Sequence, residues 1–123
     1  MRLVKREDID EPLRRSSGEI VYEMIGAPAD LGGTARHSVA EIVIPPGKSS
    51  PRHYHKVAEE TFYILRGNAR LRVDEEEFDL SPGQACLIEP FEIHQVLSVG
   101  SEELVFLAVS SPPWVPEDSV YVG

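Results

Sequence analysis

The sequence predicts an all-β domain, built as a sandwich or barrel of short strands. Eight segments have the length and apolar content of strands, and no segment keeps the 3.6-residue period of a long helix. Ten prolines and nine glycines are spread among these segments, where they mark turns. A chain of 123 residues is long enough for one hydrophobic core and short for two.

The elements follow one another from a polar arm to a proline-rich tail. Residues 1–18 are charged and favour an extended arm or a short helical turn. We expect one domain, with the arm and first strand over 1–36, the barrel over 37–110 and the tail over 111–123. The expected strands, with turns around Pro28, Pro46 and Pro82 among others, cover residues 19–25, 38–44, 61–65, 69–74, 77–80, 85–89, 95–99 and 104–109.

Three segments have patterns that indicate which way their side chains point. Residues 69–73 alternate between apolar side chains and arginines, which places Arg70 and Arg72 outside the barrel. Residues 61–65 are apolar on both faces, so their outer face needs a cover, either the N-terminal arm or a second subunit. The prolines of the tail exclude a helix or a central strand. Trp114 is expected to pin the tail to the body or, as a weaker alternative, to cover the barrel mouth.

The bulk composition excludes some partners and favours one compartment. A formal net charge of −9 argues against nucleic acid or an anionic membrane surface, because both attract basic patches. No apolar run approaches the roughly 20 residues of a membrane-spanning helix, and residues 1–10 lack the apolar core of a signal peptide. The single cysteine, Cys86, is expected as a small buried hydrophobe or as a thiol of the pocket wall. The cytoplasm is the expected location.

Two of the four histidines, His53 and His55, are the most informative residues of the chain. In a strand, residues two apart project from the same face, so both imidazoles point the same way. Glu60 opens the next strand after a short loop, and His94 follows the turn at Pro90. Three imidazoles and one carboxylate suit Fe(II), Mn(II), Ni(II), Co(II), Cu(II) or Zn(II), and the sequence does not choose among them.

These residues stand at the spacing of a family motif, and residues 38–109 resemble a small single-domain cupin. The first cupin motif runs glycine, five residues, His-x-His, three or four residues, glutamate, six residues, glycine. It is matched by Gly47, His53, His55, Glu60 and Gly67. The resemblance implies a jelly-roll barrel (a double-stranded β-helix) that binds a metal through His53, His55, Glu60 and His94. Glu59 fits the shorter form of the motif, but the closing glycine then lies one residue too late, so Glu60 is favoured.

The second cupin motif is matched only in part. It runs glycine, five residues, Pro-x-Gly, two residues, histidine, three residues, asparagine, and Gly83 and His94 stand at the required positions. Its proline, second glycine and asparagine are replaced by Glu89, Phe91 and Ser98. Because Pro90 lies between two of these positions, we expect the turn to be kept. Glu89 is a candidate catalytic acid or base, the alternative being an exposed carboxylate at a strand end.

Strand parity predicts the lining of a pocket beside the metal. The expected residues are Phe62, Ile64, Leu71, Val73 and Val96, with His37 as a further candidate at the start of a strand. Such a wall is mostly apolar. The arginines whose direction strand parity predicts all face outward, and parity gives no direction for Arg36. A sugar phosphate is therefore disfavoured, and a small oxygen-bearing organic molecule is the expected ligand.

The resemblance implies several kinds of function, since the cupin fold carries many activities. We expect a metal-dependent enzyme of oxygenase, isomerase or lyase type, with the metal as Lewis acid or oxygen binder. One alternative is a non-catalytic module that binds a sugar or organic acid through the metal. Another is a barrel in which the metal only ties strands together. Cupins of this size usually pair through an apolar sheet face, so a homodimer is expected.

Overall fold

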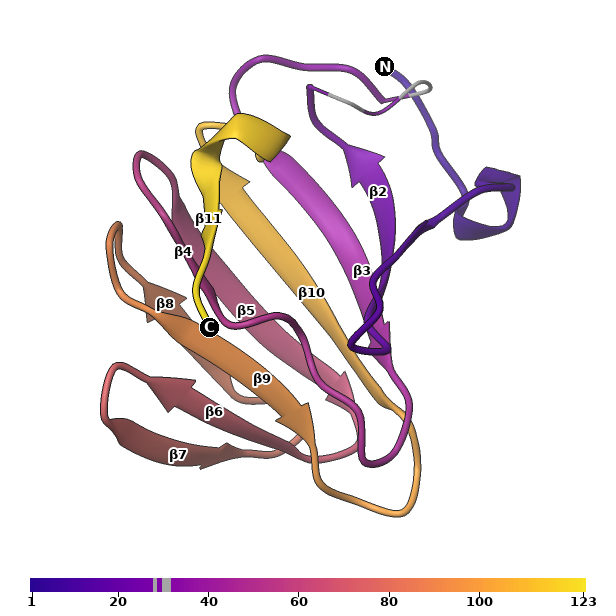
Figure 1. The fold of residues 1–123 in the computed structure, drawn as a ribbon. Helices are drawn as coiled ribbons and strands as arrows, with labels where there is room; N and C mark the ends of the chain where they lie inside the picture. Colours follow the sequence, from indigo (N-terminus) through magenta and orange to yellow (C-terminus); the bar gives the residue numbers. More distant parts are fainter. Residues whose placement is uncertain (28, 30–31) are drawn as a thin grey trace.

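In the computed structural model, which describes residues 1–27, 29 and 32–123, eleven strands form two antiparallel sheets that face each other (Figure 1). One sheet has the order β1-β2-β3-β10-β5-β8, and the other has the order β11-β4-β9-β6-β7. This is the all-β jelly roll expected from the sequence. The strands are β1 (Leu13–Arg14), β2 (Ile20–Ile25), β3 (Ser38–Ile44), β4 (His53–His55), β5 (Glu59–Arg66), β6 (Ala69–Val73), β7 (Glu76–Leu80), β8 (Ala85–Ile88), β9 (His94–Ser98), β10 (Leu104–Ser111) and β11 (Ser119–Tyr121).

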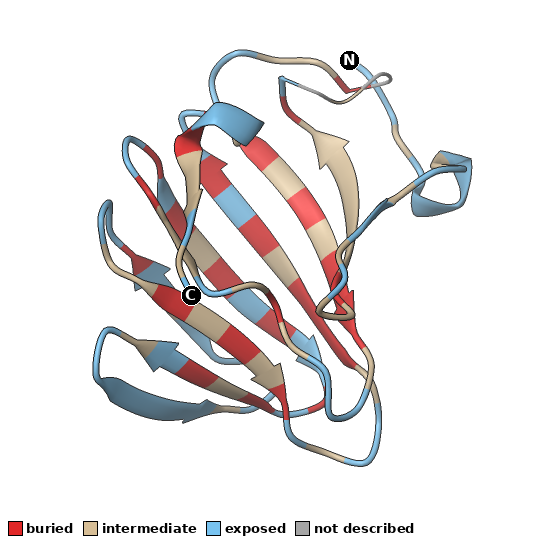
Figure 2. Ribbon diagram, viewed as in Figure 1, coloured by how far each residue is buried: buried red, intermediate tan, exposed pale blue. Residues whose placement is uncertain are grey.

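The hydrophobic core lies between the two sheets, and Figure 2 shows buried positions alternating with more exposed ones along β5 and β10. The alternation expected for β6 is confirmed, because Leu71 is buried while Arg70 and Arg72 face outward and pair with acids of β7. The core cluster consists of Ala40, Ile42, Ile44, Phe62, Ile64, Ala69, Leu71, Ile88, Val96, Leu104, Phe106 and Ala108.

The two ends of the chain join the edges of the sheets. The arm forms a 3-10 turn, η1 (Arg6–Asp8), and the short strand β1, which pairs with β2. The tail forms a second 3-10 turn, η2 (Pro116–Asp118), and then β11, an edge strand that pairs with β4. The prolines of the tail thus exclude an α-helix and a central strand, as expected, but they permit an edge strand beyond them.

Two further expectations concern the first turn and the membrane. The turn expected around Pro28 falls partly on Pro28, Asp30 and Leu31, which lie outside the described residues. Within the described part of the chain, no helix has both the length and the apolar character needed to cross a membrane.

The outer face of the six-stranded sheet carries apolar side chains that nothing in this chain covers among the described residues. Tyr63, Leu65, Leu87 and Val109 are all exposed there, on the neighbouring strands β5, β8 and β10. The N-terminal arm does not cover them, because it pairs with β2 at the opposite edge of the sheet.

Candidate metal centre

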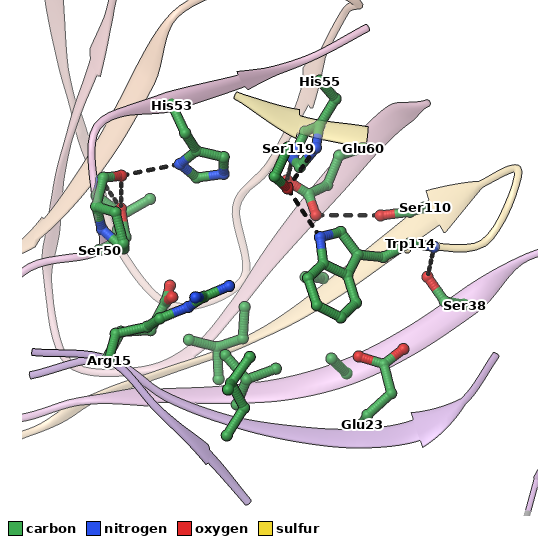
Figure 3. A pocket seen from close by; sticks show the side chains of 18 of the residues that line it. Arg15, Glu23, Ser38, Ser50, His53, His55, Glu60, Ser110, Trp114 and Ser119 are labelled. Atoms are coloured by element: carbon green, nitrogen blue, oxygen red, sulfur yellow. Dashed lines mark hydrogen bonds and ion pairs between the residues drawn. The ribbon is translucent and has the colours of Figure 1, made fainter. Parts of the chain in front are cut away.

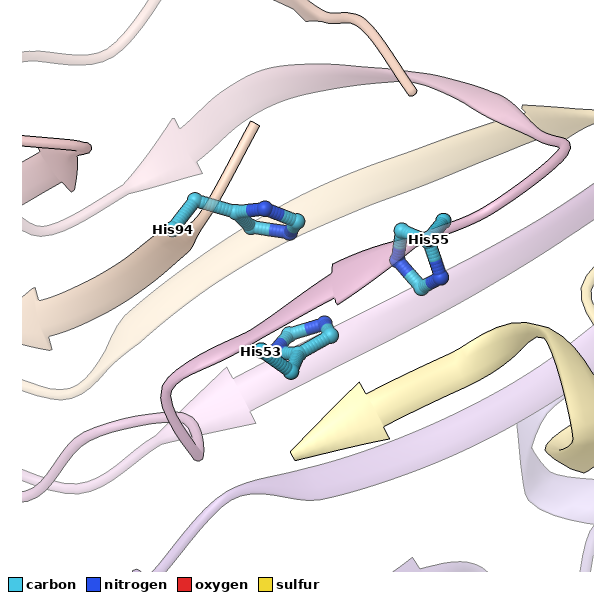
Figure 4. Close-up of side chains that lie close together, drawn as sticks. All are labelled: His53, His55 and His94. Carbon is cyan, nitrogen blue, oxygen red and sulfur yellow. The ribbon is translucent and has the colours of Figure 1, made fainter. Parts of the chain in front are cut away.

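Three histidines converge between the two sheets (Figure 4). His53 and His55 project from the same face of β4, and His94 begins the neighbouring strand β9. The antiparallel register places His94 directly opposite His53. One ring nitrogen of each histidine lies within 4.8 Å of those of the other two. The spacing and the strand register together therefore form a compact nitrogen cluster from residues 41 positions apart in sequence.

Backbone carbonyls orient two of these rings. Nδ1 of His53 lies 2.8 Å from the carbonyl oxygen of Pro51, and Nδ1 of His94 lies 2.9 Å from that of Glu92. A carbonyl only accepts, so each Nδ1 carries the proton and donates it. In the neutral ring Nε2 then keeps its lone pair, which is the state in which an imidazole binds a metal.

Glu60 lies beside the Nε2 atoms of His55 and His94. Its Oε1 is 3.4 Å from Nε2 of His55 and 3.6 Å from Nε2 of His94, while its Oε2 accepts a hydrogen bond from Ser110 Oγ at 3.1 Å. The two Nε2 atoms are within ion-pair distance of Glu60 but form no hydrogen bond with it, so both remain buried without a hydrogen-bond partner. Glu59, the alternative carboxylate, is exposed.

The electrostatics of the cluster suit a cation. Burial, aided by the neighbouring His94, lowers the pKa of His53 to about 4, so its ring is neutral at pH 7. Burial alone would raise the pKa of Glu60, but the adjacent His55 and His94 outweigh it and hold that pKa well below its usual range. An ionised carboxylate and imidazoles with unpartnered nitrogens thus fit a divalent transition metal.

The C-terminal tail contacts the cluster directly, and no motif in the sequence indicated this. Ser119 Oγ lies 3.3 Å from Nδ1 of His55 and accepts a hydrogen bond from Trp114 Nε1 at 3.0 Å. The backbone N–H of Trp114 in turn donates to Ser38 Oγ at 2.9 Å. Trp114 therefore both ties the tail to β3, as expected, and lines the cavity described below.

Asp118 holds the loop between His55 and Glu60. Its carboxylate accepts hydrogen bonds from the backbone N–H groups of Lys56, Val57 and Ala58, at 3.1, 2.8 and 3.0 Å. Only 7% of Asp118 is exposed. These three hydrogen bonds to a buried side chain thus fix the path of the chain between two of the cluster's residues.

A cavity opens beside the cluster between the two sheets, and His53, His55 and Glu60 form part of its wall (Figure 3). Its volume is about 60 Å³, counted as the space open to the centres of water-sized groups. Since one water needs about 10–15 Å³ on this measure, the cavity has room for a small ligand.

The apolar lining expected from strand parity is only partly right. Phe62 and Val96 line the cavity. Ile64 and Leu71, in contrast, are buried in the closed core, and Val73 packs against that core, so these three are corrected. Parity predicts which side chains point between the sheets, but it does not predict where that interior is filled and where it is open.

Three other candidates lie away from the cavity wall. His37 is exposed ahead of β3, which corrects its expected place in the pocket. Glu89 is an exposed carboxylate after β8 and also lies outside the wall, so it does not reach a ligand there. Cys86 is half-buried and packs against the core, the first of its two expected roles.

Charged residues from the N-terminal part of the chain line the cavity, which corrects the expectation of a wall with few charges. Arg15 follows β1, Glu19 precedes β2, and Glu23 lies within β2. Burial, together with the negative charge of Glu60, raises the pKa values of Glu19 and Glu23 to about 7. Oε1 of Glu23 is buried without a hydrogen-bond partner. Parity of the barrel strands could not predict these residues, because the pairing of β2 with β3 brings them in.

The altered second motif keeps its turn. Phe91, at the motif's glycine position, has φ of 70°, a left-handed conformation that glycine adopts without strain. Its N–H donates to the carbonyl oxygen of His55 at 2.8 Å, and its ring stacks on Tyr54 with centroids 5.7 Å apart. Phe91 thus replaces glycine at a cost in backbone strain, and the turn still delivers His94 to the cluster.

Two facing antiparallel sheets, with a His-x-His strand, a buried glutamate and a third histidine between them, define a double-stranded β-helix barrel with a histidine cluster at its centre. Comparison with known families agrees, because the Cupin domain profile matches residues 40–110. The chain belongs to the cupin family.

Its relatives include proteins of binding and of enzyme type. The Methanocaldococcus jannaschii protein MJ1618 is 31% identical over 120 residues, which cover 97% of this chain and 94% of that protein. The oxalate-binding protein of Thermotoga maritima is 28% identical over 97 residues, 79% of each chain. The structure of the polyketide cyclase RemF from Streptomyces resistomycificus superimposes with a TM-score of 0.74 at 25% identity, over 96% of this chain and 89% of that chain.

Proposed function

We propose that this cupin binds one divalent transition metal through His53, His55, His94 and Glu60, and that it acts through the metal on a small oxygen-bearing organic molecule. The observation that carries the proposal is the pair of buried, unpartnered Nε2 atoms beside an ionised carboxylate. Buried polar atoms without partners are costly, and a bound cation would satisfy them. The metal is Fe, Mn, Ni, Co, Cu or Zn, and the reaction is of oxygenase, isomerase or lyase type.

The chain's own residues have distinct roles in this proposal. When bound, such a metal supplies Lewis acidity or an oxygen-binding position. The carbonyls of Pro51 and Glu92 hold the rings of His53 and His94 in the tautomer with the proton on Nδ1. Phe62 and Val96 keep water from part of the cavity wall. Glu23, whose pKa of about 7 is near neutrality, is the wall residue suited to accept or donate a proton at its unpartnered Oε1.

The alternative is a binding module without catalysis, in which the metal holds a sugar or an organic acid. The similarity to an oxalate-binding protein favours this alternative specifically. An enzyme would turn over a ligand that reaches the metal, whereas a binding module would hold it unchanged. A metal with a purely structural role would stabilise the fold, and no small ligand would compete for its open positions.

Metal analysis tests the proposal first. The wild-type protein, His53→Ala and the matched control His37→Ala are purified anaerobically, and bound metals are measured by mass spectrometry. We expect near one equivalent in the wild type and in His37→Ala, whose histidine is exposed outside the cavity, and a large loss in His53→Ala. No metal in the wild type, even after loading with each candidate ion, would overturn the proposal.

We further propose a homodimer that covers the exposed apolar face of the six-stranded sheet. Tyr63, Leu65, Leu87 and Val109 support this assignment, because such a patch in a small protein marks an interaction surface. The cytoplasm is the proposed location, to which a chain with a single cysteine is suited.

A further inference from the structure

Arg15 is the only lysine or arginine among the described residues that line the cavity. Figure 3 shows its side chain reaching into the cavity that His53 also faces. The tight turn after β1 positions its backbone, since Arg15 N–H donates to the carbonyl of Glu19 at 2.9 Å and the N–H of Gly18 donates to the carbonyl of Arg15 at 3.0 Å. Gly18 has φ of 109°, a conformation reserved for glycine.

The guanidinium of Arg15 is held by an aromatic ring and not by an acid. Its Nη2 donates to the hydroxyl of Tyr121, and its Cζ lies 5.1 Å from the Tyr121 ring centroid. Tyr121 also lies against His53, with ring centroids 5.9 Å apart. No carboxylate of the described residues comes within the 4.0 Å of an ion pair with Arg15. Most of its five N–H donors are therefore available to a ligand.

The charges around Arg15 favour an anion in the cavity. Glu19 and Glu23 line the same wall, and burial together with the charge of Glu60 raises both pKa values to about 7, although the nearby Arg15 opposes this rise for Glu19. Each acid is therefore only partly ionised at neutral pH. A divalent cation at the cluster would more than balance the charge of the Glu60 carboxylate. Because Arg15 forms no ion pair among the described residues, its guanidinium and such a cation would together attract an anion to the space between them.

We propose that Arg15 is the specificity-determining residue for a small carboxylic acid, whose carboxylate it binds while another oxygen of the same molecule faces the histidine cluster. A guanidinium matches a carboxylate through two parallel hydrogen bonds. The cavity volume of about 60 Å³ limits the enclosed part of the acid to a few non-hydrogen atoms. This inference rests on the proposed metal site and names the class of its ligand.

The test compares acids with their neutral amides on Co(II)-loaded protein. Glycolate and malonate, with glycolamide and malonamide as neutral counterparts, are titrated into wild type, Arg15→Gln, Arg15→Lys and the control Arg14→Gln. Binding is followed by calorimetry and by the visible spectrum of Co(II), and Co(II) content is measured separately. Arg14 is the matched control, because it is exposed and lies outside the cavity wall.

We expect the wild type and Arg14→Gln to bind at least one acid about tenfold or more tighter than its amide. Arg15→Gln should lose about 10- to 100-fold of the acid affinity with its Co(II) content unchanged, and Arg15→Lys should keep part of it. If Arg15→Gln does not fold, a loss of acid affinity in Arg15→Lys, with amide affinity unchanged, supports the inference.

Two results overturn the inference while the metal proposal stands. The first is full Co(II) content in a wild type that does not discriminate acid from amide. The second is acid affinity in the Arg15 variants equal to that of the wild type. If the wild type does not hold Co(II), the titrations are followed by calorimetry with a candidate ion that it does hold. Failure of the wild type to hold any of the candidate ions overturns the metal proposal and this inference together, so the two failures are distinguishable.

Discussion

Asp118 offers the sharpest test of how the tail supports the histidine cluster. Replacing it in Asp118→Ala removes the acceptor of three backbone N–H groups, from Lys56, Val57 and Ala58. The carboxylate is nearly fully buried, and the three donors belong to the loop that joins β4 to β5. The variant should therefore destabilise the fold and loosen the path between His55 and Glu60.

The size of the effect follows from which donors water can reach. Ala58 is buried, so its N–H loses its partner without replacement, at a cost of about 1–3 kcal/mol. Val57 is exposed, so water can replace much of the loss there, at about 0.5–1 kcal/mol. Lys56 N–H loses least, because it also bonds the main-chain carbonyl of Asp118 at 3.2 Å, which the variant keeps. The sum is about 3 kcal/mol of unfolding free energy, which for a chain of this length corresponds to a melting temperature lower by about 10 °C.

The assay is urea and thermal unfolding followed by circular dichroism and by the fluorescence of Trp114, the single tryptophan. Glu117→Ala is the matched control, because this neighbouring acid is exposed and makes no side-chain hydrogen bond among the described residues. The unfolding free energy of Asp118→Asn, which keeps one acceptor oxygen, should fall between those of Asp118→Ala and Glu117→Ala. Equal unfolding free energies for Asp118→Ala and Glu117→Ala, within about 0.5 kcal/mol, would refute the reasoning.

The remaining predictions concern pH and assembly. The folded pKa of Glu23, about 7, lies above its ordinary value of 4.5, so the folded protein favours the protonated acid and loses stability as pH rises from about 4.5 to 7. The unfolding free energy of Glu23→Gln should therefore exceed that of the wild type by about 1–2 kcal/mol at pH 8 and should equal it at pH 4. A difference in unfolding free energy that does not change with pH would contradict this. Leu87→Glu should convert the proposed dimer to a monomer in sedimentation velocity, because 54% of Leu87 is exposed on the apolar sheet face. Val57→Glu, at an exposed loop position, should leave the dimer intact, and a monomeric wild type at micromolar concentration would show that no such dimer forms.

Local patterns in the sequence were sufficient for the fold class and for the histidine cluster. The period-two pattern and the turn residues predicted the eight main strands to within two residues at each end. The cluster was predictable because His53 and His55 share a strand face and because motif spacing relates both to Glu60 and His94. Spacing within and between adjacent strands is a local property, so a single sequence reveals it.

Only the tertiary structure decided what surrounds the cluster. Arg15 reaches the cavity from the N-terminal arm and Ser119 reaches it from the tail, while Asp118 of the tail holds the loop between His55 and Glu60. These positions carry no motif or periodic pattern. Ile64 points inward as parity predicts, yet it lies in the filled core instead of the cavity. Such placements depend on how two edge segments pair with distant strands and on where side chains fill the space between the sheets. Pairing and packing are properties of the assembled sandwich, and residues more than 60 positions apart come together only when it forms.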